Sequence, residues 1–266
     1  MTAYDCSTTS NFSVVQTASD YSQFAGLLAG LSFTALVIIY SQLREHGPVR
    51  HGDSLAATML SSFFSFVVAC FLYATLGGDA FPTSRSTAVN ILASLALVCA
   101  LLGLLFGITI MFVSAGTPTT RYLAVATASL LLPLLAYLYI SITILDAMTC
   151  QQQISAPRQN DVILLAVIGG VWLVLAGAAL LNRANVIQKV SGYPTHIVTW
   201  GALLIIALLS IIAAFVFEAP VDIELSRVLL FGIATALGGY LAAYSVAVWA
   251  ILMRPPLVDG AITENT

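Results

Sequence analysis

Residues 20–42 read DYSQFAGLLAGLSFTALVIIYSQ, and this stretch decides the fold. It is apolar over about the twenty residues that a helix needs to cross a bilayer. Six more stretches of this kind follow it, so further spans are predicted at residues 54–76, 88–115, 122–145, 161–181, 194–217 and 227–253. The sequence therefore predicts an all-α, polytopic integral membrane protein, a bundle of seven transmembrane helices.

The composition agrees with this prediction. Of the 266 residues, 59% are hydrophobic and 8% are charged, whereas roughly a quarter of the residues in a soluble domain are charged. The predicted organisation is a polar extracytoplasmic tail (1–19), a seven-helix transmembrane domain (20–253) and a cytoplasmic tail (254–266). The lipid bilayer is the expected surrounding, and no basic run indicates binding to nucleic acid.

Small residues are spaced at four along three of the predicted spans. Such a step bares a strip of backbone and lets another helix approach closely. We therefore predict helix-packing positions in three pairs: Gly26 and Gly30, Gly103 and Gly107, and Gly239 and Ala243. The function that these faces favour is that of a non-enzymatic membrane component or subunit, packing within its own bundle and against a membrane-protein partner or a second copy.

The centres of the spans contain no Asp, Glu, Lys or Arg. Intramembrane charges mark proton relays, ion paths and voltage sensors, so a proton-coupled transporter is disfavoured. A channel or transporter for an uncharged or lipidic solute stays open as the alternative. Within the spans, Pro133 predicts a kink, and Tyr240 and Tyr244 lie deep enough to need partners inside the bundle.

Enzymatic chemistry finds little support in the sequence, although an intramembrane metal-dependent hydrolase remains as a third hypothesis. A catalytic zinc needs three protein ligands and an open position, and the candidates at one membrane face are His46, His51 and His196 with Asp53. The last span has no His-x-x-x-His pair of the kind found in seven-span zinc hydrolases. A retinal protein needs a lysine in its last span, and Lys189 lies in a loop. No metal, cofactor or catalytic residue is predicted.

Lysine and arginine counts in the short loops predict the orientation, because these residues are enriched on the cytoplasmic side. One side carries six of them and the other carries three: Arg44, Arg50, Arg121, Arg183, Lys189 and Arg254 against Arg85, Arg158 and Arg227. The amino terminus should therefore be outside and the carboxyl terminus in the cytoplasm. The expected location is the plasma membrane or a bacterial inner membrane.

Two of the four cysteines fall in polar segments on the predicted outer side. Cys6 and Cys150 could pair there, because an oxidising compartment lets a disulfide persist. Cys70 and Cys99 lie inside two spans at depths that differ by roughly 7 Å, at 1.5 Å of rise per residue. We therefore predict a Cys6–Cys150 disulfide and two buried thiols.

Overall fold

A computed structural model describes residues 14–46, 52–78, 83–115, 117–152, 158–181, 194–218 and 226–252. Seven helical segments in these residues are long and apolar enough to cross a membrane, which confirms the all-α fold and makes the chain a multi-pass membrane protein. The helices are α1 (Val14–His46), α2 (Gly52–Gly77), α3 (Ser84–Ala115), α4 (Pro118–Ala126), η2 (Thr127–Leu131), α5 (Leu132–Gln152), α6 (Gln159–Leu181), α8 (Pro194–Glu218) and α9 (Arg227–Leu252). The fourth span is composite, because α4, η2 and α5 follow one another without a break.

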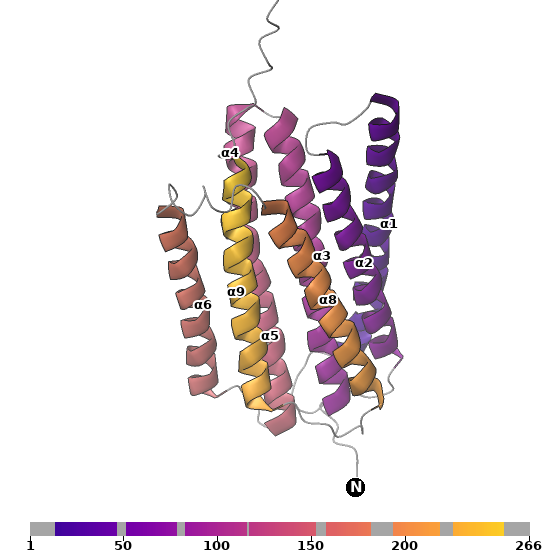
Figure 1. Cartoon of the computed structure of the whole chain (residues 1–266). Helices are drawn as coiled ribbons and strands as arrows, with labels where there is room; N and C mark the ends of the chain where they lie inside the picture. The colour runs from indigo at the N-terminus through magenta and orange to yellow at the C-terminus, as the bar shows by residue number, and fades with distance from the viewer. Residues whose placement is uncertain are drawn as a thin grey trace, which may run out of the picture.

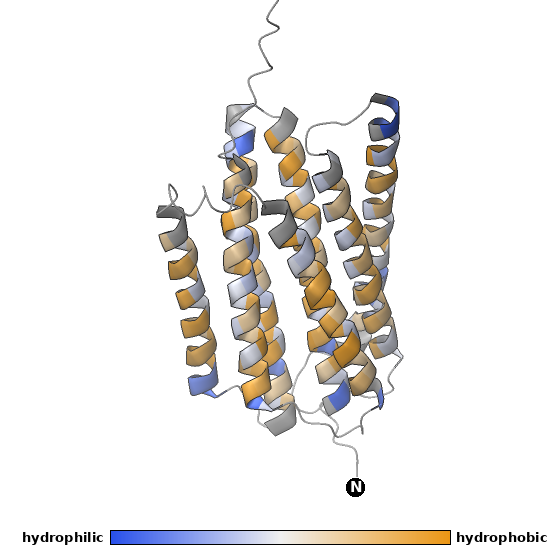
Figure 2. Ribbon diagram, viewed as in Figure 1, coloured by the Kyte–Doolittle hydropathy of each residue, from blue (hydrophilic) through white to orange (hydrophobic). Residues whose placement is uncertain are grey.

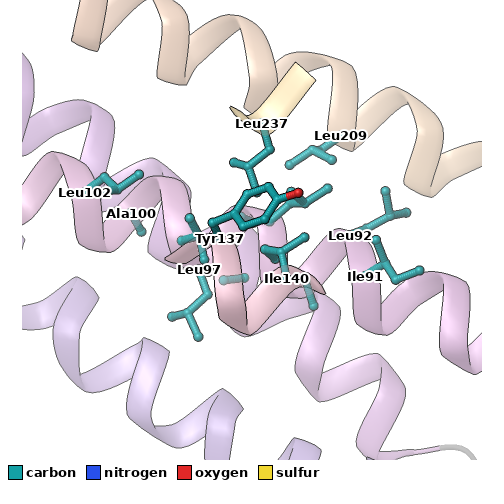
Figure 3. Packing of buried hydrophobic residues seen from close by; sticks show 14 of the residues in the cluster. Ile91, Leu92, Leu97, Ala100, Leu102, Tyr137, Ile140, Leu209 and Leu237 are labelled. Carbon is teal, nitrogen blue, oxygen red and sulfur yellow. The ribbon is translucent and has the colours of Figure 1, made fainter. Parts of the chain in front are cut away.

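The helix α3 forms the centre of the bundle, and α1 and α6 lie at opposite edges of it (Figure 1). In its most apolar window, 78% of α3 is buried inside the protein, compared with 22% for α1 and 28% for α6. Figure 3 shows the core around Tyr137 of α5, where Leu97 of α3, Leu209 of α8 and Leu237 of α9 are drawn together. The remaining surface of the edge helices is apolar and faces the bilayer.

Most of the hydrophilic segments lie at the helix ends, and the middle of the bundle is largely hydrophobic (Figure 2). The polar side chains inside α2 are kept there by bonds to their own helix. The buried hydroxyls of Ser61, Ser62 and Ser65 donate to carbonyls three or four residues earlier, at 2.7–2.9 Å. Each hydroxyl is thus satisfied without water, as the hydrocarbon region requires.

The first helix begins at Val14, six residues before the start predicted from the apolar run. Its first turns contain no Gly or Pro that would break the helix. Ala18 is 1% exposed, and a Cβ built on Gly77 would lie 3.5 Å from the backbone nitrogen of Ser19. The start of α1 therefore packs against the end of α2, and this contact extends the helix.

The kink predicted at Pro133 takes the form of a π-helical turn, η2, just before the proline. In η2 the N–H of Leu132 donates to the carbonyl of Thr127, five residues earlier. Proline has no N–H to donate, and its ring would clash with the carbonyl four residues before it in a regular helix. The wider π turn relieves this clash. The carbonyl of Ser129 lacks its usual donor, because the residue four positions later is Pro133.

Candidate functional site

Three hydroxyl groups from three helices meet inside the bundle. The oxygen of Tyr73 (α2) lies 3.1 Å from that of Ser94 (α3) and 3.1 Å from that of Tyr139 (α5). The distance between the oxygens of Ser94 and Tyr139 is 3.3 Å. The ring of Tyr21 (α1) stacks on Tyr73 with centroids 5.2 Å apart, so this cluster connects four helices.

This cluster is a network of hydroxyl groups that hydrogen-bond to one another between helices. Each of the three oxygens has one hydrogen to donate and can accept another. Three such groups within 3.3 Å of one another can therefore satisfy each other without water. The arrangement can fix the relative height of α2, α3 and α5. Sequence reasoning missed it, although tyrosines away from the membrane interface were a usable signal.

The last helix is fastened to its neighbours by hydroxyl groups along one face. The hydroxyl of Tyr244 donates to the carbonyl of Leu102 in α3 at 3.1 Å, and that of Tyr240 reaches the carbonyl of Val198 in α8 at 3.5 Å. Tyr244 is completely buried. The prediction that these two tyrosines find partners inside the bundle is therefore confirmed.

A third bond of this kind connects α9 to the π turn. The Oγ of Ser245 lies 2.7 Å from the carbonyl oxygen of Ser129 and 2.9 Å from that of Leu241, so its single hydrogen is shared between them. Both serines are 0% exposed. The usual helical donor to the Ser129 carbonyl would be the N–H that Pro133 lacks, and Ser245 supplies a donor from another helix. A buried polar group would otherwise be unsatisfied in this region.

Another face of α9 is bare. In the part of the chain that the structure describes, this face consists of four small, exposed residues, the small-residue stripe: Gly232, Ala236, Gly239 and Ala243. No described atom of a neighbouring side chain or helix lies within 4 Å of a Cβ built on Gly232 or Gly239. At 100° per residue, this stripe lies about 110° round the helix from Tyr244. In Figure 2 much of α9 is pale, whereas α6 and α8 are mostly orange.

The three predicted packing pairs have different outcomes. Gly103 and Gly107 pack against α2, where added Cβ atoms would collide with Ser62 and Met59. Gly26 is also at an α2 contact, with Cys70 Sγ 3.6 Å from its built Cβ. These three positions agree with the prediction of helix packing.

Gly30, Gly239 and Ala243 are exposed in the part of the chain that the structure describes. Gly30 is exposed, with open space around its built Cβ. The buried residues of α1 include Ala25, Ala29 and Ser32 in the middle of the helix, with Ala18 and Leu36 nearer its ends. Gly26 and Gly30 lie at the edge of this strip. Among the described residues, no other helix covers Gly30, Gly239 or Ala243, so their helix contact stays a prediction that a partner would have to meet.

The metal ligands considered from the sequence are not among the described side chains, so the geometry does not test them. No group of three His, Cys, Asp or Glu side chains that could hold a metal occurs among them. The side chains of His46, His51, His196 and Asp53 fall outside the described set.

The cysteines are only partly described. Cys70 and Cys99 are free thiols, and Cys99 is 1% exposed. Cys150 is half-buried near the end of α5 and, unlike Cys70 and Cys99, is not a free thiol. Cys6 lies outside the described residues, so the predicted pair is not tested by the geometry.

Comparison of the chain with protein-family models, curated proteins and solved structures gives no match.

Proposed function

We propose that the protein is a non-enzymatic membrane subunit that binds another transmembrane helix through the small-residue stripe of α9. The observation that carries this proposal is the contrast between two faces of one helix. Tyr240, Tyr244 and Ser245 fasten α9 to three other segments. The stripe is therefore held at a fixed angle, and no described residue covers it.

Physical chemistry explains why such a face favours a helix over lipid. Association of helices in a bilayer has no hydrophobic driving force, since lipid tails are as apolar as leucine. It depends on close packing and on weak Cα–H···O contacts, both of which need small residues at the contact. Gly239 and Ala243 supply this closeness, and the partner is a membrane protein or a second copy of this chain.

A photo-crosslinking experiment tests the proposal. A crosslinking amino acid in place of Ala236 should give one discrete crosslinked product in native membranes, and Gly239→Leu should abolish it. Gly170→Leu on α6 is the matched control, because a Cβ built there also meets open space. The control should leave the product unchanged. Only diffuse lipid adducts from a folded protein would contradict the proposal.

We further propose the orientation that the loop charges predict, with the amino terminus outside and the carboxyl terminus in the cytoplasm of a plasma or bacterial inner membrane. The six-to-three distribution of Lys and Arg supports it. A reporter that is active only in the cytoplasm, fused after Thr266, should be active. Silence from a well-expressed fusion would contradict this orientation.

A disulfide between Cys6 and Cys150 is proposed as well. Cys150 lies near the end of α5, and the start of α1 lies at the same end of the bundle (Figure 1). The tail that precedes α1 could therefore reach it. The bond would restrict the unfolded chain and so raise the free energy of unfolding by a model-dependent ~2–4 kcal/mol.

A further inference from the structure

A groove lies between α3 and the composite fourth span. Its volume is about 410 Å³, within the range of roughly 300–1,000 Å³ that is usual for small-molecule sites. It is lined by one face of α3 and by the facing side of α4, η2 and α5: Leu105, Ile108, Thr109, Phe112, Thr120, Leu123, Ala124, Thr127, Ala128 and Leu132. It lies where α3 ends and α4 begins, so one of its ends is at a membrane surface.

The groove is suited to hydrocarbon. Phe112 and Leu123 at its rim are 47% and 67% exposed, so it opens toward the bilayer. Seven of its ten lining residues are apolar. The hydroxyl of Thr109 donates to the carbonyl of Leu105 at 2.7 Å, so this donor is already used. Water would find few partners here, whereas the acyl chain of a lipid loses nothing by entering.

The charge at the end of the groove selects the lipid headgroup. Arg121 lies three and seven residues before Ala124 and Ala128, on the same face of the helix, one turn nearer the membrane surface. It is the sole charged residue of the sequence from 86 to 145. The first turn of α4 has no acidic residue, and Thr117 caps its amino end. The positive end of the helix dipole adds to the charge of Arg121.

We propose that this groove binds one anionic phospholipid, with an acyl chain between α3 and α4 and its phosphate beside Arg121. Basic pockets between transmembrane helices are known to select anionic headgroups. The apolar walls provide contact for the chain, and the start of α4 provides the preference for negative charge. Arg121 also interacts with groups of the protein itself, and the phosphate adds to these interactions.

Native mass spectrometry of the full chain tests the proposal, with phosphatidylglycerol and phosphatidylcholine of identical acyl chains as probes. The wild type should retain one phosphatidylglycerol more strongly than phosphatidylcholine. Arg121→Gln should weaken the binding of phosphatidylglycerol roughly fivefold, the factor that one basic residue contributes, and leave phosphatidylcholine unchanged. Ala124→Trp should fill the groove and remove the retention of both lipids. Thr120→Trp, at an exposed lining position, makes the same test if Ala124→Trp does not fold.

Ala166→Trp, on the exposed face of α6, is the matched control and should retain the lipid as the wild type does. Equal retention of both lipids by the wild type would overturn the headgroup assignment. Unchanged retention of phosphatidylglycerol by a folded Ala124→Trp or Thr120→Trp variant would overturn the groove as the site. A dimer that these variants dissociate would place a second copy in the groove and overturn the proposal as well.

Discussion

Replacing Gly169 by alanine should destabilise the bundle through a collision with one rigid ring. A Cβ at this position would lie 2.6 Å from Cε1 of Tyr137 and 3.1 Å from its Cδ1. The ring cannot move aside freely, because its hydroxyl donates to the carbonyl of Leu165 at 2.7 Å. It also stacks on Trp172, with centroids 6.3 Å apart. Displacement of the ring would therefore break a buried contact between α5 and α6.

The expected cost follows from two effects. Overpacking of a filled core costs about 1–3 kcal/mol, and loss of the hydrogen bond to Leu165 costs about 0.5–1.5 kcal/mol. The matched control is Gly170→Ala, the same change at the next residue, where a Cβ meets open space. The difference in helix propensity between Gly and Ala is common to both variants and cancels. Gly169→Ala should thus be about 2–4 kcal/mol less stable than Gly170→Ala.

Unfolding in detergent, followed by tryptophan fluorescence, measures this difference, and Trp172 is close to the change. The midpoint of Gly169→Ala should fall by at least about 5 °C relative to Gly170→Ala. In a Tyr137→Leu background the penalty for Gly169→Ala should shrink, because the colliding ring is absent. Equal stability of the two glycine variants would refute the packing described for Tyr137.

Three more predictions follow from the helix contacts. Ser245→Ala should lower the free energy of unfolding by about 1–3 kcal/mol, because a buried carbonyl in η2 loses its donor from α9. Ser210→Ala, on an exposed face of α8, should be neutral in the same detergent unfolding assay. Gly107→Leu should collide with α2 and lower the yield of monodisperse protein, whereas Gly30→Leu should be tolerated. Equal yields from the two variants would contradict this. Thiol labelling of denatured protein from native membranes should leave Cys150 unmodified until a reductant is added, and full alkylation without reductant would exclude the disulfide.

The sequence was sufficient for the fold because length and apolarity alone identify membrane spans. It also predicted that Pro133 interrupts its helix and that Tyr240 and Tyr244 need internal partners. What it could not give was the direction in which each helix faces. In a soluble protein the buried face is apolar and the other is polar, but in a bilayer both faces are apolar. Gly26 and Gly30 therefore looked equivalent in the sequence, although only the first lies at a helix contact.

The hydroxyl networks show a second limit of sequence reading. A hydroxyl group in a span can donate to its own helix alone, as Ser65 does, or share its hydrogen with another helix, as Ser245 does. The difference arises from where an unsatisfied acceptor lies in the folded bundle. Pro133 creates such an acceptor at the carbonyl of Ser129, and only packing of η2 against α9 brings Ser245 to it.

This connection gives the π turn a consequence for both proposed surfaces. The turn widens the fourth span at Thr127 and Ala128, which line the groove. The carbonyl of Ser129 in this turn accepts a hydrogen bond from Ser245. This bond fixes the rotation of α9, the helix that carries the small-residue stripe. A change that straightens the fourth span would therefore alter the groove and the angle of the stripe together. For this reason, occupation of the groove by a lipid and association through α9 should be energetically coupled, with each raising the affinity of the other by the same factor if both favour the π turn.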